Sequence, residues 1–568
     1  MRKLADIAKH DYSKLALFSL VFNLFFSTSF SPLTEDLGAD SLLFFTFGNW
    51  MAKDGLIPYK DMFDHKGPML WFMEGASQLL FKGPFGVFVM LFIITLFCLI
   101  LVYKTSRLLL DEKYGLTVSI IYLIFFNFTF LRGNLTEELS LPFVMLTVYL
   151  FVREYKSDFS NVKWYVGFAY GICFCSVMLI RVNNMGTLCV TLLALGLVLL
   201  IRKKIARLFL TVLTFLSGVA AVAFPVALYY IINGAFSEMI FGTFIFNFVC
   251  IGSPRQTFLQ LLSRNSAFTL PLFIFAAAGI TGAIFQILRR REYILSLTVL
   301  FSSLVNFWLA TLSMRAFPHY VTVALPSAIL GIILLAKNCG NVSKTVRIIV
   351  FTIFACAAAD LTAKAAYSFT LYYSIIDKIS DKLGIGSSFT PYVYLSGVLM
   401  CGAAALIFML FVIKRKGEKK SGLIFLAAIC TASILLNVAV IPQKRKMRTL
   451  FKNDSRAAGK LIPKENMDSV FCYNTLNGFY YYNNIVPSNK YIYFQDLHIS
   501  YYEEIFKEIV SEFEKKPPKT IVTGKRAENP EDPRLQEFLD NFIAENYIEN
   551  ENNLKETNVY EFHIYNLK

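Results

Sequence analysis

Charged residues are scarce in this chain. Only 17% of its 568 residues are charged, whereas 56% are hydrophobic, and the mean hydropathy is +0.53. This composition is too apolar for a soluble globular chain, so it predicts an integral membrane protein. The formal net charge of +15 does not indicate nucleic-acid binding, because basic residues of membrane proteins collect in their cytoplasmic loops.

The ten cysteines form neither a disulfide framework nor a metal-binding motif. Nearly all lie in apolar stretches, where Cys behaves as a small hydrophobe, and Cys173 and Cys175 are too closely spaced for a CxxC pair. Only Cys472 lies in the polar C-terminal part. No small-residue cleavage site precedes Ser31, which predicts that the first apolar stretch is retained and is not a signal peptide.

Thirteen apolar stretches are predicted to cross the membrane as helices. They are approximately 14–30, 85–103, 115–131, 138–152, 164–180, 185–201, 208–232, 267–288, 293–312, 319–336, 347–371, 391–413 and 421–440. With the N-terminus inside, every loop on that side is basic, from 1–13 to 414–420. This distribution follows the positive-inside bias, and an odd number of spans places the C-terminus outside.

Residues 441–568 contain no run long enough to span a membrane. Three short apolar strands (SVFCYN, KTIVTG and VYEFHIY) alternate there with two amphipathic helical patterns, YYEEIFKEIVSEFEKK and DPRLQEFLDNFIAENY. The alternation predicts a small mixed α/β domain on the outer face. It carries no GxGxxG, P-loop or metal-ligand spacing, so support or acceptor docking is its predicted role. The chain is thus divided into a transmembrane domain, 1–440, and an extracytoplasmic domain, 441–568.

The first outer loop, residues 31–84, concentrates polar residues between two apolar spans. LLFFTFGNWMA and MLWFMEGASQLLF are amphipathic and contain Trp, as expected for helices that lie in the membrane interface. The stretch between them, DGLIPYKDMFDHKGP, is rich in turn-forming residues. Its polar groups are therefore predicted to lie beside lipid headgroups, where an enzyme that acts on a lipid phosphate must work.

This loop resembles that of the GT-C polytopic glycosyltransferases. The likeness rests on an acidic residue in the first outer loop, an interface helix, and then the pattern G-x-x-P-Y-x-D-x-x-x-x-K-G-P over 55–68. It points to the bacterial branch related to the protein O-mannosyltransferases (glycosyltransferase family 39) and to the lipid A aminoarabinose transferase. The resemblance implies an all-α polytopic membrane protein of GT-C fold, with about 13 transmembrane helices and an outer C-terminal domain.

The family's activity is the inverting transfer of a sugar from a polyprenyl-phosphate donor. The resemblance implies that Asp40 is the catalytic base and that Lys66 contacts the donor phosphate, with Gly67 standing where some relatives have Pro. In the second outer loop, RGNLTEELSLPF, either Glu137 or Glu138 is the counterpart of a further family acid. The choice between Glu137 and Glu138 stays open.

Elementary chemistry agrees with these assignments. Transfer to a hydroxyl needs a base that takes the acceptor proton, an effect of roughly 10²–10⁴-fold, and cations that stabilise the departing phosphate. An aspartate among Phe and Trp side chains, such as Asp40, can have a raised pKa that suits a base. Lys supplies a point charge to phosphate, whereas the planar Arg guanidinium can bond two of its oxygens.

Further candidates lie at the predicted outer ends of helices. Arg181 ends the fifth span, and Arg315 and His319 flank the tenth in MRAFPHY; a similar turn recurs in GT-C relatives. Such residues can instead snorkel to water, and for Arg181 both interpretations stay open. His65 is a further candidate for the donor phosphate. The predicted supporting residues are Asp36, Tyr59 and Asp64, with solvated loop carboxylates as the alternative interpretation for the two acids.

No cofactor is predicted to be obligatory, and no metal site is predicted. A divalent cation is the alternative, because the acids at 36, 40, 137 and 138 could ligate one as in oligosaccharyltransferase-type relatives. The predicted partners are a polyprenyl-phosphate sugar donor, membrane lipid, and a glycan, lipid or protein acceptor of the cell envelope, with no nucleic acid. The predicted location is the bacterial cytoplasmic membrane.

Two other functions compete with glycosylation of the envelope. The first is a transporter or flippase of lipid-linked sugars, which predicts ionisable groups near mid-membrane and often repeated halves. The polar groups of this chain gather instead in the first outer loop and at outer helix ends, and no internal repeat is evident. The second is a non-catalytic scaffold for envelope assembly, which predicts that every outer-loop acid is dispensable.

Overall fold

The structure is a computed structural model that describes most of the chain. The described residues are 2–27, 29–34, 39–130, 133–251, 257–337, 448–475, 478–493, 495–524, 530–550 and 562–568, with scattered positions between 431 and 446. They form two compact units built from interleaved segments. Unit 1 comprises Met1–Thr28, Leu91–Val222 and Arg255–Pro442, and unit 2 comprises Ser29–Met90, Ala223–Pro254 and Gln443–Lys568.

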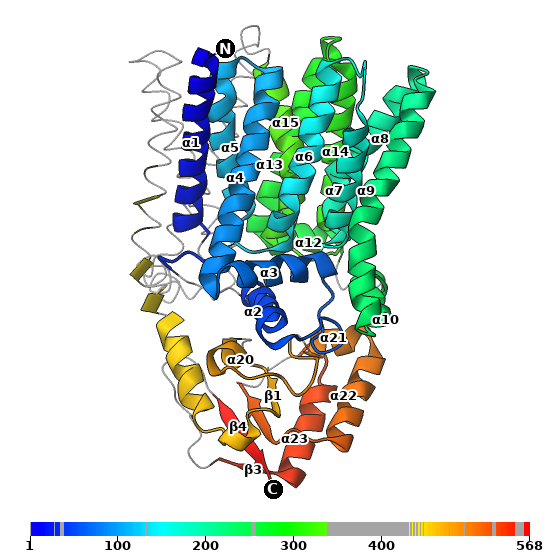
Figure 1. Ribbon diagram of the computed structural model, residues 1–568. Helices are drawn as coiled ribbons and strands as arrows, with labels where there is room; N and C mark the ends of the chain where they lie inside the picture. Colours follow the sequence, from blue (N-terminus) through cyan, green and yellow to red (C-terminus); the bar gives the residue numbers. More distant parts are fainter. Residues whose placement is uncertain are drawn as a thin grey trace. The chain divides into compact units, whose positions relative to one another are not determined.

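Unit 1 is a bundle of helices (Figure 1). Its α-helices are α1 (Arg2–Phe25), α4 (Pro84–Leu109), α5 (Gly115–Thr129), α6 (Thr136–Lys156), α7 (Trp164–Met178), α8 (Gly186–Ile201), α9 (Ile205–Ile232), α12 (Phe258–Arg264), α13 (Ser266–Leu288), α14 (Tyr293–Thr311) and α15 (Leu325–Ala336), and its short 3₁₀ turns are η1 (Glu112–Tyr114), η2 (Val182–Met185) and η4 (Pro318–Ala324). Helices α4 and α9 continue into unit 2.

The core of unit 1 lies where α13 packs against α14 and α15, and where α6 packs against α7 and α8. Helices α13 and α15 approach each other most closely at a pair of glycines. A Cβ atom on Gly282 would lie 2.2 Å from the backbone oxygen of Gly331, so the two backbones can touch only because neither residue has a side chain. Small residues at such crossings are typical of packed membrane helices.

Six helical segments in the described part of the chain are long and apolar enough to cross a membrane. They are Pro84–Leu109, Val182–Ile201, Ile205–Ile232, Phe268–Leu288, Tyr293–Thr311 and Pro318–Ala336. Each coincides with a predicted span, and the predicted spans in α1, α5, α6 and α7 are helical as well. The stretches 347–371 and 391–413, and most of 421–440, lie outside the described residues. The number of thirteen and the orientation therefore stay predictions.

Unit 2 begins with the two helices predicted for the first outer loop. Helix α2 (Ala39–Asp54) packs along α3 (Pro68–Leu80), and the proline that opens α3 suits a first helical position. Gly48 permits the contact, because a Cβ atom there would lie 2.6 Å from the Cβ of Glu74. The segment between the helices turns at Tyr59, whose backbone is left-handed with φ +70°.

The C-terminal part of unit 2 is a small mixed α/β domain, as the sequence predicts (Figure 1). Its sheet has the order β1-β2-β4-β3, with β1 and β2 parallel and the other pairs antiparallel. The predicted strands and helices are confirmed, whereas β3, α20 and α21 were not predicted. The strands are β1 (Val470–Tyr473), β2 (Thr520–Thr523), β3 (Tyr547–Glu549) and β4 (His563–Leu567), and the helices are α20 (Gly478–Asn483), α21 (Gln495–Tyr501), α22 (Glu503–Lys515) and α23 (Arg534–Asn546), with a 3₁₀ turn at η7 (Lys464–Asn466).

Three short elements complete unit 2 between its two longer segments. They are α10 (Phe236–Ile240), the π-helical turn η3 (Phe241–Ile245) and α11 (Phe246–Ile251). The apolar core of the C-terminal domain includes Phe63 from the first outer loop and Phe246 from α11. The predicted division at residue 440 stays a prediction, and the outer location of the domain does too.

Candidate functional site

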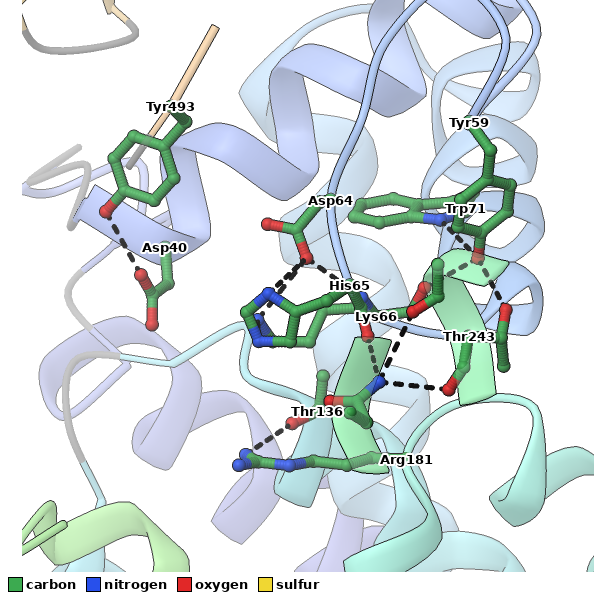
Figure 2. A network of polar contacts seen from close by, with 12 residues as sticks. Asp40, Tyr59, Asp64, His65, Lys66, Trp71, Thr136, Arg181, Thr243 and Tyr493 are labelled. Carbon is green, nitrogen blue, oxygen red and sulfur yellow. Dashed lines mark hydrogen bonds and ion pairs between the residues drawn. The ribbon is translucent and has the colours of Figure 1, made fainter. Parts of the chain in front are cut away.

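Asp64, His65 and Lys66 form a compact ionic turn in unit 2 (Figure 2). Asp64 Oδ1 accepts a hydrogen bond from the Lys66 backbone N–H at 2.9 Å and lies 3.4 Å from Lys66 Nζ. Lys66 Nζ lies 3.0 Å from His65 Nε2. Because an ammonium group can only donate, this ring nitrogen accepts. A neutral His65 therefore carries its proton on Nδ1, which lies 3.8 Å from Asp64 Oδ1.

The ionic turn keeps a charged carboxylate in a buried position. Asp64 is only 2% exposed, and burial acts to raise the pKa of its carboxyl, but the Lys66 ammonium and other nearby charges hold that pKa below its usual value. Within the described residues, Lys66 Nζ uses two of its three N–H groups, toward Asp64 and His65. The third N–H is available to a ligand, and an anion is the ligand that an ammonium group prefers.

Tyr59 contacts the backbone of this turn. Its buried hydroxyl donates to the Lys66 carbonyl oxygen at 2.6 Å and accepts from Trp71 Nε1 at 3.1 Å and Thr243 Oγ1 at 3.2 Å. Burial raises the pKa of Tyr59 far above its usual value, so the group stays a neutral donor. The supporting role predicted for Tyr59 stays a prediction.

Asp40 lies in the first turn of α2 and is half-buried. Its Oδ1 accepts a hydrogen bond from the Tyr493 hydroxyl at 3.2 Å, and within the described residues its Oδ2 has no hydrogen-bond donor. Phe44 lies one helical turn further on the same face, and its ring centre is 5.9 Å from Lys66 Nζ. Asp40 therefore faces the side on which the Lys66 ammonium lies.

Tyr493 connects the two parts of this arrangement. It is only 8% exposed, and its burial, together with the charges of Asp40 and Asp64, raises the pKa of its hydroxyl. Both carboxylates thus lie close enough to act on one phenol. The described part of unit 2 brings together the proposed base, the proposed phosphate ligand and three of the residues expected to support them, which are Tyr59, Asp64 and His65.

The second predicted group lies in unit 1. Arg181 Nη1 pairs with Glu137 Oε1 at 2.5 Å, and the two side chains are 17% and 3% exposed. The guanidinium also stacks on Tyr320, 4.3 Å from the ring centre, and Glu137 Oε2 accepts a hydrogen bond from the Thr136 hydroxyl at 3.0 Å. Arg181 is therefore engaged by specific partners within the protein, which argues against simple snorkelling to water.

The two adjacent acids at the start of α6 have different partners. Glu138 Oε2 accepts a hydrogen bond from the Asn134 backbone N–H at 2.7 Å, so Glu138 stabilises the turn that opens the helix, whereas Glu137 holds the arginine. His319, in η4, is 8% exposed and its ring lies 4.7 Å from that of Tyr320. Arg315 is half-buried in the segment that precedes η4.

The predicted site residues thus fall into two groups. Unit 2 contains Asp40, Tyr59, Asp64, His65 and Lys66, and unit 1 contains Glu137, Glu138, Arg181, Arg315 and His319. Asp36 lies outside the described residues. Their functional roles stay predictions, and so does the expectation about metal. Among the residues that the structure describes, no three His, Cys, Asp or Glu side chains are grouped so as to hold a metal ion.

Two residues at this site were missed by sequence reasoning, Tyr493 and His498. His498 lies in α21 and is fully buried, and within the described part of the chain neither of its ring nitrogens has a hydrogen-bond partner. Burial lowers the pKa of His498 to about 4, against the opposing effect of the Asp64 carboxylate. No motif surrounds either residue, and Tyr493 is 453 positions from its partner Asp40, so only the folded chain reveals them.

The fold and the apolar helices define the class of protein, which is a polytopic membrane protein of GT-C-like fold. The structure of ArnT from Cupriavidus metallidurans bound to undecaprenyl phosphate matches with a TM-score of 0.58 and 14% identity over 97% of both chains. Its apo state matches with a TM-score of 0.57 and 14% identity over 98% of both chains. At this identity the likeness shows the fold alone.

Three further findings concern similarity to known proteins. An oligosaccharyltransferase from Archaeoglobus fulgidus, tethered to an acceptor peptide, gives a TM-score of 0.44 at 12% identity over 90% of this chain and 69% of the other. No curated protein matches the sequence. Residues 2–348 match the family described as "Putative competence-induced protein Ccs4 N-terminal domain". That match covers more than half of the chain, and the chain belongs to this family.

Proposed function

We propose that this protein is an inverting glycosyltransferase that moves a sugar from a polyprenyl-phosphate-linked donor to a hydroxyl of an envelope glycan, lipid or protein. One observation carries the proposal. In unit 2 the Asp40 carboxylate faces the same side as the Lys66 ammonium, and within the described residues Asp40 Oδ2 and one N–H of Lys66 have no partner. The donor class is supported by the ArnT structure, which contains undecaprenyl phosphate.

The proposed reaction assigns one role to each of these groups. The acceptor hydroxyl oxygen attacks the anomeric carbon of the sugar while Asp40 Oδ2 takes its proton. The bond from the anomeric carbon to the phosphate oxygen breaks, and the polyprenyl phosphate leaves with the electron pair. Lys66 Nζ donates to the phosphate as negative charge develops on it. Attack from the face opposite the leaving group inverts the anomeric configuration.

The supporting residues set the positions of these two groups. Asp64 holds the Lys66 side chain from one side, and Tyr59 holds its backbone from another. A cation that is fixed before the donor arrives needs little reorganisation in the transition state. We further propose that no divalent cation is required, and transfer that survives treatment with EDTA is the expected result. The donor-phosphate roles that the resemblance implies for Arg181, Arg315 and His319 stay predictions.

The test is the substitution Asp40→Asn in the purified full-length protein. The probe is a panel of undecaprenyl-phosphate hexoses, and the readout is release of undecaprenyl phosphate with transfer to an acceptor or to water. Loss of the base is expected to lower turnover by roughly 10²–10⁴-fold. The matched control is Asp54→Asn, the same change at an exposed position at the other end of α2, which should retain full turnover.

A binding measurement separates the base from the phosphate ligand. Asp40→Asn is expected to bind undecaprenyl phosphate as the wild type does, whereas Lys66→Met should bind it more weakly because the ammonium is lost. Full turnover of a normally expressed Asp40→Asn protein would remove the proposed base. Movement of the lipid-linked sugar across a vesicle bilayer, with no new glycosidic bond formed, would favour the flippase instead.

A further inference from the structure

One segment of the C-terminal domain reaches the first outer loop at several points. We call residues 490–498 the brace segment; its described residues are 490–493 and 495–498. The Phe63 backbone N–H donates to the Lys490 carbonyl oxygen at 2.8 Å. The Phe63 ring lies 5.2 Å from the ring of Tyr491. The loop is therefore attached to the C-terminal domain by its backbone as well as by apolar packing.

The brace segment also contacts the ionic turn. The imidazole of His498 stands edge-on to three rings, those of Phe63, His65 and Phe246, with centres 5.3–5.8 Å away and planes 84–90° apart. The histidine has no exposed surface. Its ring packs against the ring of His65, whose Nε2 accepts a hydrogen bond from the Lys66 ammonium. A shift of the brace segment would move this turn.

The third contact is made by Tyr493 to Asp40. In the described part of the chain this hydroxyl is the one hydrogen-bond donor to the Asp40 carboxylate, and it occupies Oδ1 at 3.2 Å. A carboxylate at the start of a helix can rotate about its side-chain bonds, so a single donor on one oxygen decides where the other oxygen points. Oδ2 is left open for a proton from outside. The titratable groups whose charges act on this phenol are Asp40 and Asp64.

We infer that the C-terminal domain completes the transferase site through its brace segment, and that Tyr493 is the positioning residue that aims the Asp40 carboxylate at the acceptor. This inference rests on the proposed function, because it assigns a partner to the proposed base. The C-terminal domain, for which the sequence predicted support or acceptor docking, is thereby given a direct contact with the proposed base. Tyr493 itself touches Asp40 and is not assigned to the substrate.

The test compares two tyrosines of the brace segment that lie two positions apart. Tyr493→Phe removes the hydroxyl on Asp40 and keeps the ring. Tyr491→Phe removes a hydroxyl that donates to Glu508 at 2.5 Å, and it serves as the matched control because Tyr491 is also buried and makes no hydrogen bond to Asp40. Turnover is measured as release of undecaprenyl phosphate from the undecaprenyl-phosphate hexose that the wild type uses fastest.

For Tyr493→Phe we expect kcat to fall about tenfold with an unchanged KM for the donor, since a hydrogen bond to a charged group is lost. Binding of free undecaprenyl phosphate should match that of the wild type. Tyr491→Phe should behave as the wild type in all three measurements.

The outcomes separate this inference from the proposed function. If Asp40→Asn is inactive while Tyr493→Phe keeps the wild-type kcat, the positioning role is wrong and the proposed function stands. If both tyrosine variants lose kcat equally, or if Tyr493→Phe loses donor binding together with kcat, Tyr493 acts only on folding and the inference is overturned. If Asp40→Asn retains full turnover, the proposed function fails and the inference fails with it.

Discussion

His498 gives a prediction whose size follows from its burial. A fully buried imidazole with no hydrogen-bond partner within the described residues is neutral, and burial lowers the pKa of His498 to about 4. In the unfolded chain its pKa returns to the ordinary value of about 6.5. Between these two values the unfolded state binds the proton and the folded state does not. The stability that depends on His498 is therefore complete above pH 6.5 and is lost as pH falls toward 4.

The magnitude follows from the distance between the two pKa values. A difference of about 2.5 units corresponds to about 3 kcal/mol at 1.36 kcal/mol per unit. Asp496, on the same helix, acts in the opposite direction, because burial raises its pKa to about 6. Its contribution is present at low pH and is lost as pH rises through 6. The free energy of unfolding of the wild type can therefore vary little between pH 4 and pH 6.5. The effect of His498 must be measured as the difference in this free energy between the wild type and a variant.

The perturbation is His498→Phe, which keeps an aromatic ring against Phe63 and removes both unpaired nitrogens. Unfolding of the full-length protein in detergent is followed by intrinsic fluorescence from pH 4 to pH 7.5. Relative to the wild type, the variant should gain about 3 kcal/mol as pH falls from 6.5 to 4. The same change at His563, a half-buried position in β4, is the control. A difference between wild type and His498→Phe that does not vary with pH would refute the reasoning.

Three further predictions concern packing and pairing. Arg181→Met should destabilise the protein by about 3–5 kcal/mol, because it leaves the buried Glu137 carboxylate without its cation, and adding Glu137→Gln should restore most of that loss in thermal unfolding; an additive double variant would contradict the pairing. Tyr59→Phe should cost about 1–3 kcal/mol by leaving buried groups unpaired, whereas Tyr230→Phe, whose buried hydroxyl has no partner within the described residues, should cost nothing, and equal effects would contradict the argument. Gly48→Leu should force α2 away from α3 and lower the yield of folded protein in size-exclusion chromatography, and a normal profile would contradict the close approach.

The elements that the sequence predicted are those encoded by local patterns. The apolar runs predicted the helices of unit 1, and the alternation of strands and amphipathic helices predicted the C-terminal domain. The stretch that contains Tyr59 and Asp64 was predicted to be rich in turns from its own residues, whereas the ion pairing within it was not predicted. In each case the residues that decide the structure lie within one or two turns of one another.

The contacts that were missed join segments that are distant in the sequence. In the sequence, Tyr493 is an aromatic residue in a polar stretch, and the residues next to it in the chain do not indicate that Asp40 is its partner. His498 lies in α21, a short helix that was not predicted. The pairing of Glu137 with Arg181 was hidden in the same way, since two adjacent acids of equal charge cannot be told apart until the fold gives each its partner. Such choices are made by tertiary packing.

The interleaving of unit 2 has a consequence for biosynthesis. Asp40 and Tyr493 are 453 positions apart in the chain, and a ribosome adds about 5–20 residues per second. The first outer loop therefore waits roughly 20–90 s after its synthesis before its partner exists. During that interval Phe63 lacks the residues of the C-terminal core in which it packs in the folded chain. If the proposed function holds, the site is complete only after Tyr493 has been translated.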